Sequence, residues 1–206
     1  MKPNKNTLPR EFFTRQDVVL IARQLLGKVL YTCMNGEITS GIITETEAYA
    51  GITDKASHAF NGTHTARKEV MYRIGGTAYV YLCYGIHSLF NVVTSVENEP
   101  HAILIRGILP LHGKEIMEKR IRKPITSIKQ GLGPGKVASL LAIHYSNSGI
   151  DMCSDNKSGN KHAKIWIEDA GIEIRDSEII IGPRVGVAYA GADALLPYRF
   201  MWEQKK

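Results

Sequence analysis

The chain has 206 residues, long enough for one well-buried core and short for two, so we expect a single domain over 1–206 with flexible tails at 1–8 and 203–206. Hydrophobic residues make up 44% and charged residues 22% of the sequence, which excludes disorder over most of its length. The net charge of +6 favours a polyanionic partner, although charge alone is weak support for nucleic-acid binding.

Secretion and membrane insertion are not indicated. The N-terminal segment is polar, and the apolar stretch Val18–Leu30 is interrupted by Arg23 and Lys28. The three cysteines are odd in number and lack paired short spacing, which argues against a disulfide framework and against a zinc site. We therefore expect a cytoplasmic protein with reduced thiols.

The first elements are a helix and a hairpin. Thr14 and Asp17 have the spacing of a capping arrangement, apolar residues then recur at helical spacing, and Gly27 can end the helix, which predicts a helix over about 15–26. Asn35-Gly36 accepts positive φ at both turn positions and predicts a hairpin between strands 28–33 and 38–49.

The remaining elements are mostly short strands. We expect strands over about 78–83, 89–96, 102–106, 164–168, 172–175 and 184–189, helices over about 112–122 and 135–145, and a surface loop over 155–161. Runs of strands with short connections and few helices favour an α+β domain built on a curved antiparallel or mixed sheet.

Two of these strands carry the residues most suited to chemistry. Strand alternation places Glu45, Glu47 and Tyr49 on one face. By the same period, Tyr79 and Tyr81 share a face of the next strand. A carboxylate among aromatic rings suits a site that activates water beside a flat heterocycle. The same spacing also fits glutamates on a solvated strand face and tyrosines that pack with wet hydroxyls.

Tyr84 follows near the end of that second strand, just before Gly85. An aromatic residue in such a place can project into a partner, and aromatic or apolar wedges are known in DNA-binding proteins. The alternative is an ordinary strand-end aromatic.

The stretch 50–76 is the longest without clear periodicity, and long irregular loops in compact domains are commonly functional. It contains His58, His64, Arg67, Lys68 and Arg73. Because it lies between the two chemical segments, we expect it to cover a pocket or grip phosphate, with Arg67 as a candidate phosphate contact. The alternative is an exposed polar excursion.

A glycine-rich turn precedes the second expected helix, at Gly131–Lys136. It is not a Walker sequence, because its glycines are too closely spaced and Val137 replaces the hydroxyl residue. Its amides and Lys136 can bind a backbone phosphate at a helix start, or the segment can be a plain turn. The densest basic stretch, over 114–129, is typical of a solvated helix face.

In order and spacing these segments resemble the alkyladenine (3-methyladenine) DNA glycosylase family, from about residue 9 to about 202. The resemblance is carried by Glu11-Phe12-Phe13, Glu47-Ala48-Tyr49, His58, Tyr79-Val80-Tyr81, Tyr84-Gly85, Asn91, Arg106, Gly133-Pro134-Gly135-Lys136 and Gly182-Pro183-Arg184-Val185-Gly186. It implies a compact fold with an antiparallel sheet, similar to the C-terminal domain of methionyl-tRNA formyltransferases.

The resemblance implies that Glu47 holds the attacking water and acts as its base, with Arg106 beside that water. Glu45 is given no comparable role. A glycosidic bond breaks through an oxocarbenium-like sugar, so a carboxylate near C1′ is favourable. No lysine or terminal amine is supplied as a nucleophile, which implies a monofunctional glycosylase.

The resemblance also assigns the base pocket. Tyr49 and Tyr81 match positions that stack on the extruded base, His58 matches one that makes polar contact with it, and Asn91 shapes the pocket. Tyr84 matches the residue that fills the gap left by the flipped nucleotide.

The implied partner is double-stranded DNA that contains damaged purines such as 3-methyladenine, 7-methylguanine, hypoxanthine or ethenoadenine. We expect a monomer, associated with the nucleoid if the source is bacterial. No cofactor is implied. The histidines are scattered without the pairing of zinc hydrolases, so no metal site is expected.

The sequence departs from the family at Ser88, where many relatives carry a bulkier residue, and in ending soon after Trp202. Two rival hypotheses remain. One is a protein that binds damaged or bent DNA without cutting it, and the other is a different nucleic-acid-modifying enzyme suggested by the formyltransferase likeness.

Overall fold

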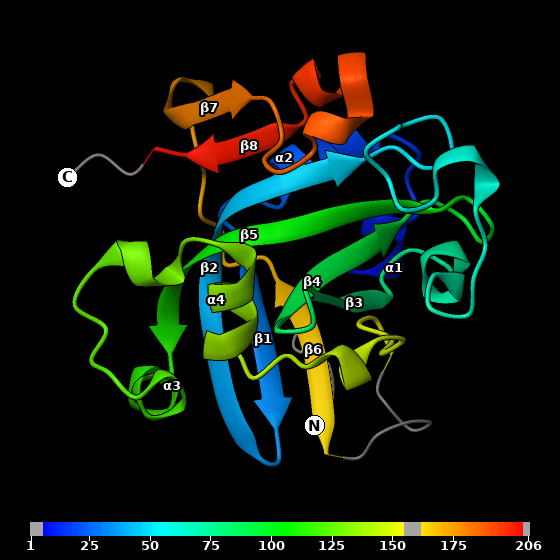
Figure 1. The fold of residues 1–206 in the computed structure, drawn as a ribbon. Coiled ribbons are helices and arrows are strands. Elements are labelled where there is room, and N and C mark those ends of the chain that lie inside the picture. Colours follow the sequence, from blue (N-terminus) through cyan, green and yellow to red (C-terminus); the bar gives the residue numbers. More distant parts are fainter. Residues whose placement is uncertain (1–5, 155–161, 204–206) are drawn as a thin grey trace.

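The computed structural model describes residues 6–154 and 162–203, whose strands form one sheet flanked by short helices (Figure 1). In this part of the chain the strands follow the order β3-β4-β5-β2-β1-β6, while β8 pairs with both β2 and β7. Every pairing between these strands is antiparallel. The predicted α+β class is therefore confirmed, with an open antiparallel sheet.

The element bounds are as follows. The strands are β1 Val29–Met34, β2 Glu37–Tyr49, β3 Ala78–Cys83, β4 His87–Thr94, β5 His101–His112, β6 Ala163–Glu168, β7 Ile179–Gly182 and β8 Arg199–Trp202. The α-helices are α1 Arg10–Phe13, α2 Val18–Gln24, α3 Lys114–Ile121 and α4 Pro134–Leu140. Short 3₁₀ segments are Phe60–Gly62, Glu69–Tyr72, Ile128–Gly131, Tyr145–Asn147, Asp176–Glu178 and Ala188–Leu195.

The predicted Asn35-Gly36 hairpin is confirmed. Both residues have positive φ, 52° and 86°, as a two-residue hairpin turn requires. The turn sets the register in which Met34 lies opposite Glu37 and Val29 opposite Ile42. This register pins the first half of β2.

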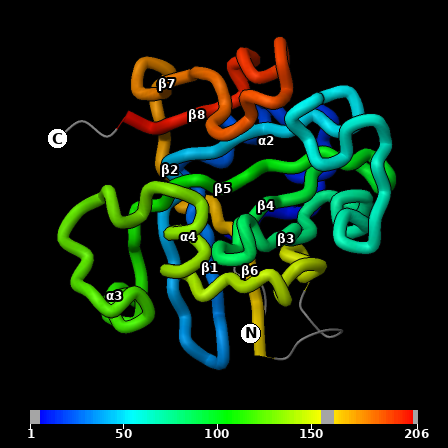
Figure 2. Tube along the Cα trace, in the orientation of Figure 1, coloured from blue at the N-terminus to red at the C-terminus, as the bar shows by residue number. Residues whose placement is uncertain are grey.

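The second half of β2 exchanges its neighbour. On one edge, β5 pairs along Ser40–Tyr49, while on the other edge β8 replaces β1 and pairs with Glu45–Glu47. Figure 2 shows the red β8 beside the blue β2, although more than 150 residues separate them in sequence. The carboxylates of β2 therefore lie between β5 and β8.

Helices pack on both faces of the sheet. The predicted first helix is confirmed as α2, which begins after Asp17, whose side chain accepts a hydrogen bond from the Leu20 amide at 2.8 Å. It lies behind the sheet in Figure 1, and Thr46 Oγ1 donates to the Ala22 carbonyl at 2.8 Å. In front, Thr32 Oγ1 donates to the Leu141 carbonyl, just after α4, at 2.8 Å.

Large apolar side chains fill the space between sheet and helices. The fully buried ones include Phe13, Ile21, Leu25, Phe90 and Ile105. Burying an aliphatic or aromatic side chain stabilises a fold by about 1.5–3 kcal/mol each. This core supports the sheet beneath the site described below.

Two expected strands are absent among the described residues, and others differ in length. Residues 172–175 form no strand, and 184–189 form a bend followed by a 3₁₀ segment. β7 and β8 were not expected. β5 continues past Arg106 to His112. The strand tolerates Pro110 because this residue lies at a register shift. The helix expected over 112–122 therefore begins only at Lys114.

The helix expected over 135–145 is confirmed in position but ends at Leu140, because Ala142 adopts a φ of 51° that does not continue a helix. The described residues that follow it, up to 154, form turns, a short 3₁₀ segment and bends. α4 therefore provides only two turns over the front of the sheet.

The expected flexible tails at 1–8 and 203–206, and the expected surface loop 155–161, fall largely outside the described residues. Within them, the Leu8 amide donates to the Ile167 carbonyl at 2.8 Å, and the Glu203 amide donates to the Glu178 carbonyl at 2.7 Å. Leu8 is also buried. Leu8 and Glu203 are therefore each paired with a strand or turn of the domain, and the flexibility of the tails stays a prediction. No helix in the described chain is long and apolar enough to cross a membrane.

Candidate active site

Glu47 lies in the second half of β2, and its side chain is fully buried. Its Oε1 accepts a hydrogen bond from the Val185 amide at 2.7 Å, and its Oε2 accepts one from the Tyr49 hydroxyl at 2.8 Å. Arg106 Nε lies 3.3 Å from Oε1. All three neighbours line a cavity of about 260 Å³. The carboxylate therefore lies directly behind these three residues, and we call this part of the lining the floor of the cavity.

The electrostatic state of Glu47 is set by opposing effects. Burial raises its pKa above the ordinary value, and Glu45 adds to this rise. The charge of Arg106 and the hydrogen bonds from Val185 and Tyr49 act in the opposite direction. A carboxylate with a raised pKa is a better proton acceptor than an exposed one, provided that it stays ionised at the working pH.

Glu45 and Arg106 complete the polar layer beside Glu47. Glu45 Oε1 accepts hydrogen bonds from Arg106 Nε at 3.0 Å and from Arg199 Nε at 2.6 Å. Glu45 and Glu47 are both buried, so the alternative of a solvated strand face is wrong. Their shared contact with Arg106 confirms that they point to the same side of the sheet.

Aromatic rings form the walls of the cavity. Tyr49, His58, Tyr79 and Tyr81 all line it. The His58 ring meets Tyr81 edge to face with centroids 4.6 Å apart, and Tyr79 lies 5.6 Å from Tyr81. These rings come from three separate segments, namely β2, the 50–76 loop and β3. The arrangement provides flat apolar surfaces at a scale that suits a heterocycle.

His58 is neutral over the ordinary pH range. Burial lowers the pKa of His58 to about 4, and the nearby Arg67 and Lys68 add to the effect. His58 Nδ1 lies 3.0 Å from the Tyr79 hydroxyl, within hydrogen-bond distance. Burial also raises the pKa of Tyr79 to about 12. The pair therefore contributes an uncharged imidazole and an uncharged phenol to the cavity wall.

Asn91 lies on β4 directly opposite Tyr79 and also lines the cavity. Its side-chain Nδ2 donates to the Tyr79 carbonyl at 3.1 Å and to the Leu89 carbonyl at 3.4 Å. These bonds fix the amide in place, since a buried amide without partners is unfavourable.

Tyr84 stands at the tip of the β3–β4 hairpin, which forms the rim of the cavity. Tyr84 and Gly85 have φ values of 50° and 71°, and the Ile86 amide donates to the Cys83 carbonyl at 3.1 Å, as in a type I′ turn. A positive φ is unfavourable for a bulky residue. The Tyr84 side chain is 93% exposed and Ile86 is 75% exposed. The hairpin thus presents two apolar side chains to solvent beside the opening.

The two candidate phosphate contacts differ in position. The Arg67 guanidinium lies 6.0 Å from the centre of the Tyr81 ring, one of the rings that line the cavity. Lys136 is exposed on α4, and its Nζ donates to the Lys129 carbonyl at 3.0 Å. In the glycine-rich turn, the Gly133 amide donates to the Arg106 carbonyl at 2.7 Å, so this turn supports β5 at the floor.

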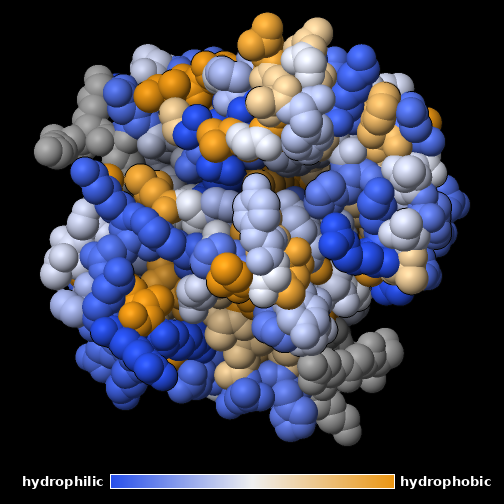
Figure 3. Space-filling model, in the orientation of Figure 1, coloured by the Kyte–Doolittle hydropathy of each residue, from blue (hydrophilic) through white to orange (hydrophobic). Residues whose placement is uncertain are grey.

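The space-filling view shows a mainly polar face with a recess below the C-terminal segments (Figure 3). The model of the methylpurine-DNA glycosylase family matches residues 11–206 of the sequence. The chain belongs to this family. The resemblance noted from the sequence is thereby confirmed, and the chain is a DNA glycosylase, a hydrolase of base excision repair that acts on damaged DNA.

Similar proteins are found in diverse bacteria. A protein of Chlamydia abortus, provisionally named 3-methyladenine DNA glycosylase, is 43% identical over 199 residues, covering 94% of this chain and 97% of that protein. Proteins with the same provisional name are 40% identical in Desulfitobacterium hafniense, covering 97% and 96% of the two chains, and 36% identical in Clostridium perfringens, covering 97% of each. The likeness therefore extends over nearly the whole chain.

Around the glycosylase cavity, some residues to which the sequence assigned no role hold its parts together. Val185 binds Glu47 through its amide, and Arg184 forms a buried ion pair with Asp54. Both residues lie in the run Gly182–Gly186 that carried the family resemblance, but a backbone donor or a buried ion pair has no signature in a single sequence. Tyr79 was seen as part of a tyrosine pair without a role of its own.

Within the described part of this glycosylase, no three His, Cys, Asp or Glu side chains gather in a way that would hold a metal ion. The acidic residues near the cavity are instead paired with arginines.

Proposed function

We propose that this glycosylase hydrolyses the N-glycosidic bond of alkylated or deaminated purines in double-stranded DNA, with Glu47 as the base that activates water. The observation that carries the proposal is the place of Glu47, a buried carboxylate directly behind a cavity lined by its own hydrogen-bond partners. A carboxylate oxygen has two lone-pair positions, so each oxygen can accept a further hydrogen bond from water.

The proposed step is a hydrolysis. The water oxygen bonds to C1′ of the sugar, the C1′–N bond breaks, and its electron pair leaves with the base. The water proton passes to Glu47. Positive charge develops on the sugar, and a nearby carboxylate stabilises that charge. Arg106, which contacts both Glu45 and Glu47, orients the carboxylate and lies on the cavity wall beside the position of the water.

The aromatic walls hold the extruded base. Tyr49 and Tyr81 stack on its faces, His58 makes a polar contact as a neutral imidazole, and Asn91 shapes the end of the pocket. Stacking of a base on an aromatic ring contributes about 1–3 kcal/mol. The support for these roles is that all four side chains line the same cavity.

Base flipping is assisted by Tyr84. Its exposed ring at a hairpin tip beside the cavity is placed to enter the duplex and fill the space of the flipped nucleotide. Arg67 and Lys136 are proposed to contact DNA phosphates, which would make binding strongly dependent on salt.

The substrates that we propose are 3-methyladenine, 7-methylguanine, hypoxanthine and ethenoadenine, and the names of the relatives support the first of these. The reaction is monofunctional, because no lysine is among the described residues that line the cavity. Its product is an intact DNA strand with an abasic site. The whole chain acts as a single-domain monomer, since one flipped base requires one protomer.

The test is base release from duplex oligonucleotides that carry hypoxanthine or ethenoadenine, and from methylated DNA. Strand cleavage in hot alkali reports abasic sites, and circular dichroism confirms folding. We expect Glu47→Gln to abolish release. Glu45→Gln is the matched control, because Glu45 is also buried on β2 and also binds Arg106, and we expect it to retain most activity.

Near-native release by folded Glu47→Gln would contradict the proposed mechanism. Lesion-selective binding by the native chain without any base release would instead identify a non-catalytic binder of damaged DNA. Strand cleavage without alkali would contradict the monofunctional assignment.

A further inference from the structure

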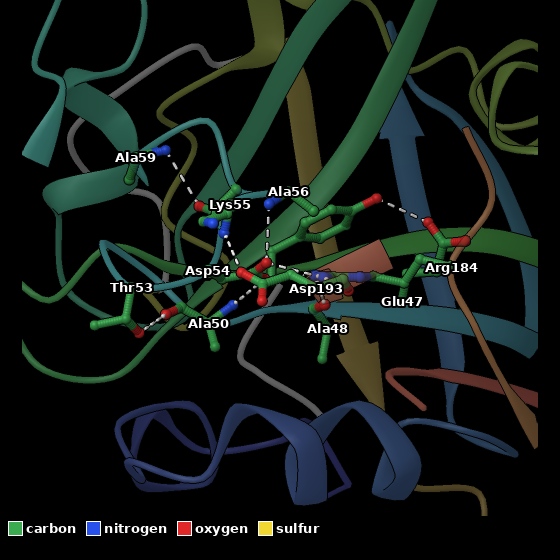
Figure 4. A network of polar contacts seen from close by, with 12 residues as sticks. Glu47, Ala48, Ala50, Thr53, Asp54, Lys55, Ala56, Ala59, Arg184 and Asp193 are labelled. Carbon is green, nitrogen blue, oxygen red and sulfur yellow. Dashed lines mark hydrogen bonds and ion pairs between the residues drawn. The ribbon is translucent and has the colours of Figure 1, made fainter. Parts of the chain in front are cut away.

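Arg184 is a buried arginine that does not line the cavity but joins several segments that do. Its Nη1 donates to the Ala48 carbonyl at 2.9 Å and to Asp54 Oδ2. Its Nη2 donates to Asp54 Oδ1 at 2.9 Å and to the Asp193 carbonyl at 3.1 Å. Figure 4 shows the guanidinium at the centre of this network. One side chain thus connects the end of β2, the 50–76 loop and the 188–195 segment.

The guanidinium also packs against two aromatic rings. Its central carbon lies 4.9 Å from the centre of the Tyr49 ring and 5.3 Å from that of Tyr198. The Nε of Arg184 is buried without a hydrogen-bond partner among the described residues, so the ring contacts and the terminal nitrogens determine its position. Guanidinium stacking on tyrosine is favourable, and more so where water is excluded.

Arg184 is connected to Glu47 in two ways. The residue after Arg184 is Val185, whose amide donates to Glu47 Oε1 at 2.7 Å. The ring packed on the guanidinium is that of Tyr49, whose hydroxyl donates to Glu47 Oε2 at 2.8 Å. Arg184 makes no hydrogen bond to Glu47 among the bonds described. It is, however, the covalent neighbour of one uncharged donor to Glu47, Val185, and packs against the other, Tyr49.

We propose that Arg184 is a positioning residue that holds the Tyr49 hydroxyl and the Val185 amide against the two oxygens of Glu47. The proposal rests on the proposed function of Glu47 as the base. The ion pair with Asp54 secures the guanidinium, since a bidentate arginine–carboxylate pair fixes both orientation and distance. The Ala48 and Asp193 carbonyls prevent it from rotating within the pair.

This role has a consequence for pH dependence. Glu47 is faced by charged or titratable groups from every element around it, namely Glu45 and Tyr49 on β2, Arg106 on β5, Tyr81 on β3, Arg199 on β8, and Arg184 and Tyr189 of the C-terminal segment. Hydrogen bonds from Val185 and Tyr49 lower the pKa of Glu47 against the effect of burial. If these donors move away, the pKa of Glu47 rises further and activity begins only at higher pH.

The experiment measures single-turnover release of hypoxanthine from a duplex oligonucleotide over a range of pH. Three variants are compared with the native chain. Arg184→Lys keeps one charge beside Asp54 but loses the planar contacts, and the double variant Arg184→Gln with Asp54→Asn removes both charges together. Tyr49→Phe removes one donor and leaves the ion pair intact.

For the two Arg184 variants we expect the rate at neutral pH to fall on the order of 10²-fold, the size of effect that a misplaced catalytic group produces. The acid limb of the profile moves to higher pH in both, and less so in Tyr49→Phe. Tyr49→Phe leaves the ion pair of Arg184 and Asp54 intact. It therefore tests whether loss of a hydrogen-bond donor to Glu47 moves the acid limb, even if the Arg184 variants do not fold.

The matched control is Arg10→Gln. Arg10 Nη2 donates to both carboxylate oxygens of Asp151, at 2.6 and 2.7 Å, and Nη1 donates to the Gly75 carbonyl at 2.8 Å, but Arg10 does not line the cavity. We expect this variant to lower the melting temperature without moving the acid limb, because a merely structural arginine has no route to Glu47.

Three results would overturn the proposal. They are a native acid limb in the folded Arg184 variants, a native acid limb in Tyr49→Phe, and an equal shift in Arg10→Gln. Failure of the proposed function gives different results from failure of the Arg184 proposal. It appears as base release by Glu47→Gln or as no base release by the native chain, and both of these proteins keep Arg184.

Discussion

The cavity has a floor, formed by Glu47 with its hydrogen-bond partners, and a rim, formed by the tip of the β3–β4 hairpin. These two regions are held in place by different kinds of contact. At the floor, Glu47 and Arg106 are buried or nearly so, and Arg184 is buried behind them. All three are held by hydrogen bonds or ion pairs from distant parts of the chain. At the rim, Tyr84 is 93% exposed and is carried by a single local turn.

The difference separates two tasks. A catalytic carboxylate must be held in place before the substrate arrives, since its orientation cannot be adjusted at no cost during reaction. A residue that inserts into a duplex gains from remaining outside the core, because all of its contacts are made in the complex. Changes at the floor are therefore expected to affect chemistry and folding, and changes at the rim to affect DNA binding.

The largest expected effect is the pH dependence of base release. Glu47 acts as a base only when ionised, and its pKa is raised by burial, so activity should rise with pH through a value above the ordinary glutamate range. Full protonation removes a general-base contribution of about 10²–10⁴-fold. His58, with a pKa of about 4, remains neutral over this limb and does not contribute.

The measurement is the single-turnover rate against pH, with melting curves recorded alongside. A raised carboxyl pKa means that the folded state binds the proton more tightly, so the stability contributed by Glu47 is lost as pH rises through the folded pKa. In Glu47→Gln this part of the pH dependence of stability should disappear. An acid limb within or below the ordinary glutamate range would contradict the prediction.

The second largest effect is on stability, from Asp54→Ala, which removes the buried ion-pair partner of Arg184 behind the floor. This change leaves the fully buried Arg184 guanidinium without its carboxylate, and removing one partner of a buried pair costs about 3–5 kcal/mol. Burial alone would raise the pKa of Asp54, but hydrogen bonds from Arg184 and from the Ala50 and Ala56 amides outweigh it and lower the pKa. The stability is thus present above the ordinary aspartate pKa and lost as pH falls through the folded value.

Urea unfolding measures this loss. Asp151→Ala is the control, because its pair with Arg10 is partly exposed and solvent weakens it, so a smaller loss is expected. Equal losses in the two variants would show that burial of the Asp54 pair adds nothing.

The third prediction concerns the rim. Tyr84→Ala should leave the free energy of unfolding unchanged, because the side chain is exposed, and should weaken binding to a lesion-containing duplex by about 1–3 kcal/mol. Tyr84→Phe keeps the ring and should bind nearly as well as the native chain. A filter-binding or fluorescence titration distinguishes them, and native affinity in Tyr84→Ala would exclude the wedge role.

The smallest effect is expected in the turn that carries Tyr84. Gly85 has a φ of 71° and open space around its Cα, so Gly85→Ala should cost about 1 kcal/mol through backbone strain alone. Gly182→Ala also has open space but no positive φ, and it should cost less. Equal melting temperatures for the two variants would show that the turn carries no strain.

The sequence predicted those parts of the fold that depend on neighbouring residues. Asn35-Gly36 determines its own turn, and that turn places β1 against the first half of β2. Alternation along β2 likewise predicted that Glu45 and Glu47 point to one side. Local geometry is sufficient for such predictions, because the side-chain period of a strand does not depend on its partners.

Prediction from the sequence failed where pairing between strands far apart in the chain determined the structure. β7 and β8 have only four residues each, and their place is set by contact with the second half of β2 rather than by their own pattern. The segment 184–189 has the β-branched composition of a strand, but the buried Arg184 side chain and the Val185 amide are engaged by Asp54 and Glu47 instead.

For the site, the sequence by itself determined the candidate residues. These are one carboxylate, a set of aromatic rings and the tyrosine that precedes Gly85, and they were found from their residue types and from an order that resembles the family. Only the tertiary structure decided that Glu47 is buried, which groups donate to it and that Arg184 stands behind both. The reason is physical. Burial, pKa and hydrogen-bond partners depend on segments more than a hundred residues apart, and a single sequence does not specify which distant groups will meet.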